Sequence, residues 1–162
     1  MKASRVISAF FLSVAAASSA NAGAQALELD KLGENAWGED WAGGCWFHEE
    51  FLPDRSGGEL MFLIRGEGKG GVAVLSLDGK VEEVPFSQTL SKSKAFRMGA
   101  RDSYLYRSAD LKVKVTTIVT EVPTANECAG DCNESSGFAA EIEISKGARN
   151  RRYEFKAGAC GL

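Results

Sequence analysis

The strongest constraint on the fold of this chain is a two-residue alternation of apolar and polar side chains, which begins near Gly44 and continues almost to the C-terminus. In the segment 138–145 the polar positions include Glu141 and Glu143, and in the segment 111–117 lysine and threonine alternate with leucine and valine. Successive side chains of a strand leave opposite faces of a sheet. The pattern therefore predicts strands with one face in a core and the other in water.

Turn-forming residues divide this part of the chain into short segments with the strand pattern. Asp78-Gly79, between two of these segments, is typical of a tight hairpin turn. Strands at such short spacing predict an all-β fold, a single antiparallel β-sandwich or barrel with a short N-terminal lead-in segment. The candidate strands are 45–51, 60–65, 72–77, 80–85, 95–98, 104–108, 111–122, 138–145 and 151–157.

The N-terminal segment 1–22 has the pattern of a secretory signal peptide. Lys2 and Arg5 give it a basic start, an apolar stretch follows, and residues 20–22 (Ala-Asn-Ala) form the small-residue pattern at which a signal peptidase cleaves. No later apolar run is long enough to span a membrane as a helix. The sequence therefore predicts a periplasmic or secreted protein without a membrane span.

Two units follow the expected cleavage point. Residues 23–43 form a lead-in segment, which is either extended or contains one short helix, and residues 44–162 form the antiparallel β domain. A domain of this length buries enough surface for one core. We find no internal repeat, linker or low-complexity tract that would divide it further.

The charge of the chain argues against a nucleic-acid partner. Lys and Arg number 19 against 22 for Asp and Glu, which gives a net charge of -3 and no general attraction for a phosphate backbone. Basic residues do gather near the C-terminus, and Arg149, Arg151 and Arg152 are the candidates for a patch that binds an acidic partner. The alternative is a solvated face that serves solubility alone.

All four cysteines lie in the part of the chain that we expect to be exported. An even number of cysteines in an oxidising compartment predicts disulfide bonds. Cys128 and Cys132 flank turn-forming residues and can meet across a tight loop. This pairing leaves Cys45 to bond with Cys160, a bridge that would close almost the whole domain and stabilise it.

A zinc site is the alternative use of these cysteines. Cys45 and His48 have C-x2-H spacing, and with Cys128 and Cys132 they make a possible tetrahedral set. Thiolates outside the cytoplasm tend to be oxidised, however. Cys45 and His48 are also an odd number of residues apart, so on a strand their side chains leave opposite faces unless a bulge intervenes. We therefore expect no metal and no cofactor.

The sequence predicts no catalytic residue. His48 is the only histidine, and the chain has no G-x-S-x-G elbow and no cysteine that we expect to be free. Carboxylate pairs such as Glu82/Glu83 are not specific, because any acidic protein of this size offers them, whereas a glycosidase needs two carboxylates across a cleft. A binding role is thus favoured over an enzyme.

The densest aromatic and acidic region contains Trp37, Trp41 and Trp46. Exposed tryptophans stack on sugar rings or anchor protein partners, whereas buried ones would cover the end of the fold. The sequence predicts an exported, non-catalytic binding protein whose partner is a protein or an envelope component such as a glycan, with enzyme inhibition as one form of that role. The alternatives are a small secreted hydrolase acting on glycan or peptide, and a structural envelope component.

Overall fold

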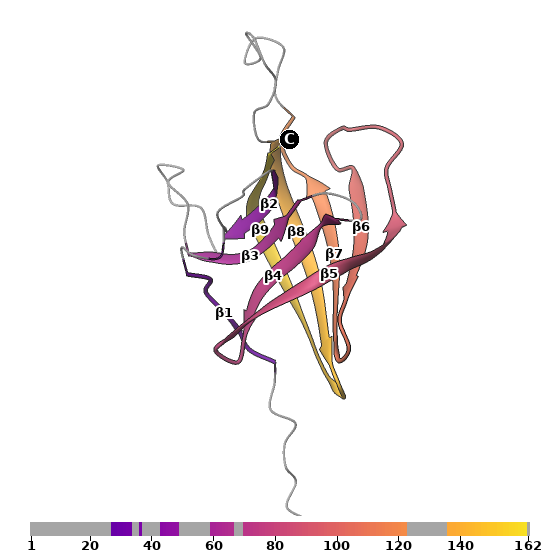
Figure 1. Ribbon diagram of the computed structural model, residues 1–162. Coiled ribbons are helices and arrows are strands. Elements are labelled where there is room, and N and C mark those ends of the chain that lie inside the picture. Colours follow the sequence, from indigo (N-terminus) through magenta and orange to yellow (C-terminus); the bar gives the residue numbers. More distant parts are fainter. Residues whose placement is uncertain are drawn as a thin grey trace, which may run out of the picture.

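The computed structural model of the chain describes residues 27–33, 36, 43–48, 59–66, 70–122 and 136–161 (Figure 1). Within these ranges all regular elements are strands of one antiparallel sheet, which confirms the predicted all-β class. No helix in the same ranges is long and apolar enough to cross a membrane. The strands are β1 (Leu29–Asp30), β2 (Gly44–His48), β3 (Leu60–Arg65), β4 (Val72–Leu77), β5 (Lys80–Ser91), β6 (Arg101–Arg107), β7 (Leu111–Val119), β8 (Ser136–Lys146) and β9 (Arg149–Gly161).

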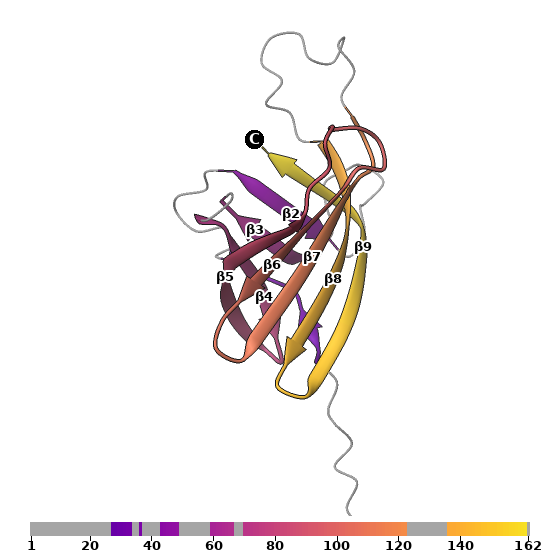
Figure 2. The same cartoon turned by 90° about the vertical axis from the view of Figure 1, so that its right-hand side faces the viewer.

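Strands β2 to β9 close into a barrel. Each strand pairs antiparallel with the next along the chain, and β2 also pairs with β9. Of the two expected architectures, the structure thus shows the barrel, with eight strands in its wall. Figure 2 shows β5 to β9 side by side around that wall. A barrel of this size is wide enough for side chains to fill it or for one small ligand to enter.

The seam between β2 and β9 carries a disulfide bond between Cys45 and Cys160. The two residues are direct partners in the strand register, and their Cα atoms are 4.0 Å apart. The predicted Cys45–Cys160 pair is therefore confirmed, and the bond removes the Cys45 thiolate from the alternative zinc set. The second predicted pair, Cys128 with Cys132, lies outside the described residues.

The β4–β5, β6–β7 and β8–β9 turns lie at one end of the barrel (Figures 1 and 2), and the core includes apolar side chains next to these turns, among them Leu77, Leu111 and Ile144. We call this end the closed end and the opposite end the open end. Every second residue of a strand points inward, so the alternation in the sequence places the core. The largest fully buried side chains of this core include Leu27, Phe47, Phe62, Leu75, Leu77, Leu111, Ile142 and Ile144.

The N-terminal segment is attached to the closed end. The Tyr153 hydroxyl donates a hydrogen bond to the Leu27 carbonyl (2.7 Å) and accepts one from the Leu29 amide (2.9 Å). Strand β1 pairs with Ser76 and Leu77, the part of β4 that β3 leaves uncovered. Residues 29 and 30 of the lead-in segment therefore extend the sheet, whereas the Ala36 amide donates to the Gly33 carbonyl (3.0 Å) in a single helical turn.

Strands β3 and β4 are buried on both faces. Outside the barrel, Leu32 of the lead-in segment forms a second cluster with Leu60, Leu63 and Val74, and the partly buried Trp46 packs against it. A strand that is covered on both faces needs no polar side. This cover explains why β3 and β4 read as continuous apolar runs and do not alternate.

The main departure from the expected strands lies between β5 and β6. The segment 95–98, expected to be a strand, belongs instead to the connection 92–100, and β5 extends to Ser91. That prediction is wrong because the end of this segment turns back on itself, with the Ala100 amide donating to the Arg97 carbonyl (2.9 Å). Asp102 accepts a hydrogen bond from the Ser93 amide (2.7 Å), which draws the connection over the open end. The other expected strands correspond to β2, β3, β4 and β6 to β9.

Candidate functional site

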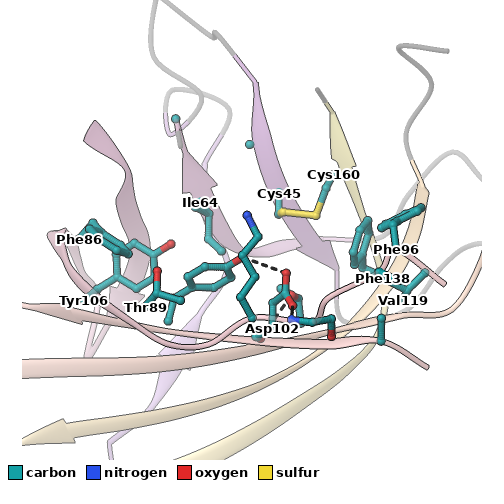
Figure 3. A pocket seen from close by; sticks show the side chains of 18 of the residues that line it. Cys45, Ile64, Phe86, Thr89, Phe96, Asp102, Tyr106, Val119, Phe138 and Cys160 are labelled. Atoms are coloured by element: carbon teal, nitrogen blue, oxygen red, sulfur yellow. Dashed lines mark hydrogen bonds between the residues drawn. A yellow bond between two sulfur atoms is a disulfide. The ribbon is translucent and has the colours of Figure 1, made fainter. Parts of the chain in front are cut away.

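The open end of the barrel contains a pocket of about 580 Å³ (Figure 3). This volume lies within the range of about 300 to 1,000 Å³ found for pockets that bury small ligands. The pocket is the part of the interior that the core side chains at the closed end leave empty. The lining includes the disulfide of the seam and the side chains of Ile64, Phe86, Thr89, Tyr104, Tyr106, Val119 and Phe138.

Strand β6 supplies Asp102, Tyr104 and Tyr106 to the pocket. These residues are two positions apart and share the inward face of the strand. In the register with β7, Asp102 lies opposite Thr117, which also lines the pocket, and Tyr106 lies nearer the closed end, opposite Val113. Strand β6 therefore places polar groups at successive depths between the mouth and the floor.

Strand β5 and the residue that follows it line the pocket with Phe86, Thr89 and Lys92, which are three positions apart instead of two. The register with β6 shifts between Phe86 and Gln88 and again between Thr89 and Ser91. A β-bulge inserts an extra residue and changes the direction of the side chains that follow. The two shifts thus turn all three side chains towards the pocket.

Two aromatic pairs form walls on opposite sides of the pocket (Figure 3). On one side Phe86 and Tyr106 meet edge to face, with ring centroids 5.9 Å apart. On the other side the ring of Phe96, from the connection 92–100, lies 6.1 Å from that of Phe138. Aromatic pairs at these distances make rigid apolar surfaces. A ligand between them would contact rings on both sides.

The Tyr106 side chain is nearly buried, with 4% of the residue exposed, and its hydroxyl is directed into the pocket (Figure 3). No described residue hydrogen-bonds this hydroxyl. Burial, and to a smaller degree the neighbouring Tyr104, raises the pKa of Tyr106. The hydroxyl therefore stays protonated near neutral pH and can donate. No buried side-chain nitrogen or oxygen of the described residues lacks a partner, so this unpaired hydroxyl is open to the pocket and can bond a ligand atom there.

Asp102 fixes the connection 92–100 across the mouth. Its Oδ1 accepts a hydrogen bond from the Ser93 amide (2.7 Å), and its Oδ2 accepts one from the Tyr104 hydroxyl (3.2 Å). The Ser93 hydroxyl also donates to the Arg101 carbonyl (2.9 Å) and accepts from the Arg101 amide (3.0 Å). Both oxygens of the carboxylate are thus engaged within the protein, which makes Asp102 a positioning residue.

Cationic side chains at the mouth form no ion pair with any described residue. Lys92 and Lys94 line the pocket and are exposed, and Arg97 follows in the same connection. Arg101, by contrast, pairs with Glu141 on the outer wall of the barrel (2.6 Å). The charge of the two lysines is therefore available at the entrance to the pocket.

The arginines identified in the sequence as a possible binding patch lie on β9, and none of them lines the pocket. Arg149 forms an ion pair with Asp78 (3.1 Å), and Arg152 forms one with Glu141 (3.0 Å). Arg151 lies over an aromatic ring of its own strand, 5.2 Å from the centroid. Each arginine thus has an intramolecular partner, and its role in recognition stays a prediction.

Among the remaining candidates from the sequence, Trp46 and His48 are described, and neither lines the pocket. Trp46 points outward from β2 into the second apolar cluster, and His48 ends the same strand. Trp37 and Trp41, and the acidic neighbours of His48, lie outside the described residues. Whether the tryptophans bind a partner stays a prediction.

Sequence analysis did not identify the residues of the pocket. Tyr104 and Tyr106 stand two positions apart in an expected strand, and this spacing is the one signal that could have placed them on one inward face. Phe86, Thr89 and Lys92 have no strand spacing at all. Only the bulges of β5 bring these three together.

The pocket offers apolar surfaces and hydrogen-bond donors. Within the described part of the chain, no group of three His, Cys, Asp or Glu side chains is placed to hold a metal ion. Comparisons of the chain with models of protein families, with curated proteins and with solved structures found no match. The functional argument therefore rests on the geometry and chemistry of the pocket.

Proposed function

We propose that this chain is an exported, non-catalytic binding protein that holds a small, largely apolar ligand in the pocket at the open end of the barrel. The observation that carries the proposal is the hydroxyl of the buried residue Tyr106, which is open to an aromatic-lined pocket and has no hydrogen-bond partner among the described residues. Apolar pockets with a few directed polar groups are the usual form of small-ligand sites.

The rigidity of the pocket supports binding. The disulfide holds the wall at the seam, and Asp102 holds the connection at the mouth, so the lining is ordered before a ligand enters. A preformed site avoids the entropy cost of ordering side chains on binding.

The proposed export rests on the N-terminal pattern and on the disulfide. Residues 1–22 lie outside the described ranges, so their role as a signal peptide stays a prediction. A structural disulfide between the first and last strands of a barrel is typical of proteins that fold in oxidising compartments.

The test uses N-phenyl-1-naphthylamine, a neutral apolar fluorophore whose emission rises in apolar surroundings. We expect saturable binding of one fluorophore per chain to the exported protein with its disulfide intact. Thr89→Trp adds an indole inside the pocket and should lower the affinity at least about tenfold, because the ring occupies the space that the fluorophore needs.

Gln88→Trp is the matched control. Gln88 is the neighbour of Thr89 on β5, is exposed and does not line the pocket, so the same side chain at this position should leave the affinity unchanged. Circular dichroism and thermal unfolding verify that both variants are folded. Absence of saturable binding to the folded protein, or equal affinities for Thr89→Trp and the unaltered chain, would refute the proposal.

A further inference from the structure

Hydrogen-bond donors gather on one side of the pocket. The hydroxyls of Thr89 and Tyr106 lie together on the side formed by β5 and β6 (Figure 3). Lys92, which directly follows β5, also lines the pocket. Neither Lys92 nor the Tyr106 hydroxyl forms a hydrogen bond or ion pair with another described residue, and Lys92 is cationic. These groups together present positive charge and two hydroxyl donors.

The opposite side of the pocket is apolar. Phe96, Phe138 and Val119 form it, and Figure 3 shows these side chains facing the donors across the pocket. The side with Thr89 and Tyr106 therefore adds hydroxyl groups to its aromatic wall, whereas the opposite side offers apolar groups alone. A ligand that matches both sides is amphiphilic.

The charged side chains at the mouth of the pocket determine whether the polar group of the ligand is an anion or a cation. Lys92 and Lys94 line the pocket without an ion pair among the described residues, whereas the lining carboxylate of Asp102 already accepts two hydrogen bonds within the protein. Residues 92–101 contain no acidic side chain. Two lysines against one carboxylate leave a net positive charge in the lining, so a cationic ligand would be repelled here and an oxyanion attracted.

We propose that the ligand is an organic oxyanion with an apolar body, bound with its acid group against Lys92, Thr89 and Tyr106 and its body against Phe96 and Phe138. The inference rests on the proposed function and adds the chemical class of the ligand. A carboxylate and a phosphate monoester share this chemistry, and Lys94 adds attraction for either one at the entrance.

The test compares four compounds with the same decyl body: decanoate, decyl phosphate, decanol and decyltrimethylammonium. Binding of each to the exported protein is measured by isothermal titration calorimetry below the micellar concentration. We expect the better of the two anions to bind at least about tenfold more tightly than decanol, because charge-assisted hydrogen bonds are stronger than neutral ones. The ammonium compound should bind more weakly than decanol. The order of the two anions distinguishes a carboxylate from a phosphate ligand.

Variants assign the effect to the pocket. Lys92→Gln should lower the affinity for the preferred anion about tenfold and leave that for decanol unchanged, because it removes the charge and retains most of the side chain. Tyr106→Phe should lower the affinity for the anion about fivefold. Lys112→Gln, which removes an exposed lysine from the outer wall, is the matched control and should change neither affinity.

Two results would overturn the inference. Equal affinities for decanol and both anions would show that the acid group is not recognised, and an unchanged anion affinity in Lys92→Gln would show that Lys92 does not hold it. If the neutral fluorophore binds in the pocket and either result is found, the inference fails and the proposed function stands. If the fluorophore shows no saturable binding to the folded protein, the proposed function fails and the inference fails with it.

Discussion

The two ends of the barrel are formed by the same strands but are held together by different interactions. At the closed end, short turns join the strands, and the core side chains pack against the N-terminal segment 27–30. At the open end, the connection 92–100 crosses the mouth and the interior contains the pocket. Packing of the core thus stabilises the closed end. The open end depends on a disulfide and a few hydrogen bonds, and its interior remains open to a ligand.

The links at the open end compensate for the missing packing. The disulfide joins β2 to β9, and the hydrogen bonds of Asp102 and Ser93 hold the connection. A filled interior would remove the pocket, so a hollow end needs restraints in its wall. The comparison predicts that changes to the core of the closed end or to the links of the open end alter stability, whereas changes to the other side chains of the pocket alter binding.

The largest expected effect comes from opening the seam. Replacing both Cys45 and Cys160 by alanine should lower the free energy of unfolding by about 4 kcal/mol, because the disulfide closes a loop with a sequence separation of 115. Urea unfolding, followed by tryptophan fluorescence, measures the change. The double variant is preferable to a reducing agent, which would also act on Cys128 and Cys132. An unchanged free energy would show that packing alone holds the open end.

The next largest effect tests the packing of the closed end. Leu27→Ala should lower the free energy of unfolding by about 3 kcal/mol, because truncating this fully buried side chain leaves a cavity in the core. Leu90, which is 43% exposed near the mouth, is the control, and Leu90→Ala should change stability by less than about 0.5 kcal/mol. Equal losses for the two variants would contradict the difference between the ends.

A pair of tyrosines compares the two ends with the same chemical change. Tyr153→Phe removes a donor to the Leu27 carbonyl and an acceptor from the Leu29 amide, and should cost about 1 to 2 kcal/mol of stability. Tyr106→Phe should change stability by less than about 0.5 kcal/mol, because no described residue hydrogen-bonds its hydroxyl. Chemical denaturation of both variants checks the difference. A larger loss for Tyr106→Phe would reverse the assignment of the two ends.

The smallest expected effect is a loss of stability at acid pH. The side-chain hydrogen bond from Lys146 (3.1 Å) is the main cause that lowers the pKa of Glu82 from its ordinary value of 4.5. The folded state therefore binds this proton less tightly than the unfolded chain does. The contribution to stability is complete above pH 4.5 and is lost as the pH falls through the lower, folded-state value.

The contribution of the Glu82–Lys146 pair to the free energy of unfolding should be below about 1 kcal/mol, because both side chains are partly exposed. Glu82→Gln should make stability less dependent on pH below pH 5, in unfolding curves recorded at steps of pH. The matched control is Glu83→Gln, since Glu83 is more exposed on the same strand. A steeper dependence in Glu82→Gln would contradict the sign of this contribution.

Most strands could be predicted from the sequence because their side chains alternate between the solvent-exposed outer face and the buried inner face of the barrel wall. The alternation in 111–117 and 138–145 corresponds to β7 and β8. It does not distinguish a barrel from a sandwich, since closure depends on one distant pairing. The confirmed bond between Cys45 and Cys160 marks that pairing, but two cysteines alone indicate only that two points of the chain meet.

The pocket could not be predicted because it depends on departures from the alternation. The bulges of β5 align Phe86, Thr89 and Lys92, and no local pattern in the sequence indicates a bulge. Sequence analysis selected tryptophans and arginines where they were dense along the chain. The pocket is instead assembled from residues that are sparse in sequence and converge only after closure.

The register of the barrel also has a consequence for the order in which it forms. Within the wall, every pairing except that of β2 with β9 joins strands that are consecutive along the chain. Consecutive hairpins close small loops and form early, whereas the contact between the outermost strands has the largest loop to close. Closure of the barrel should therefore be the last step of folding. The formation of the Cys45–Cys160 bond during oxidative folding would then report the time at which each molecule closes its barrel.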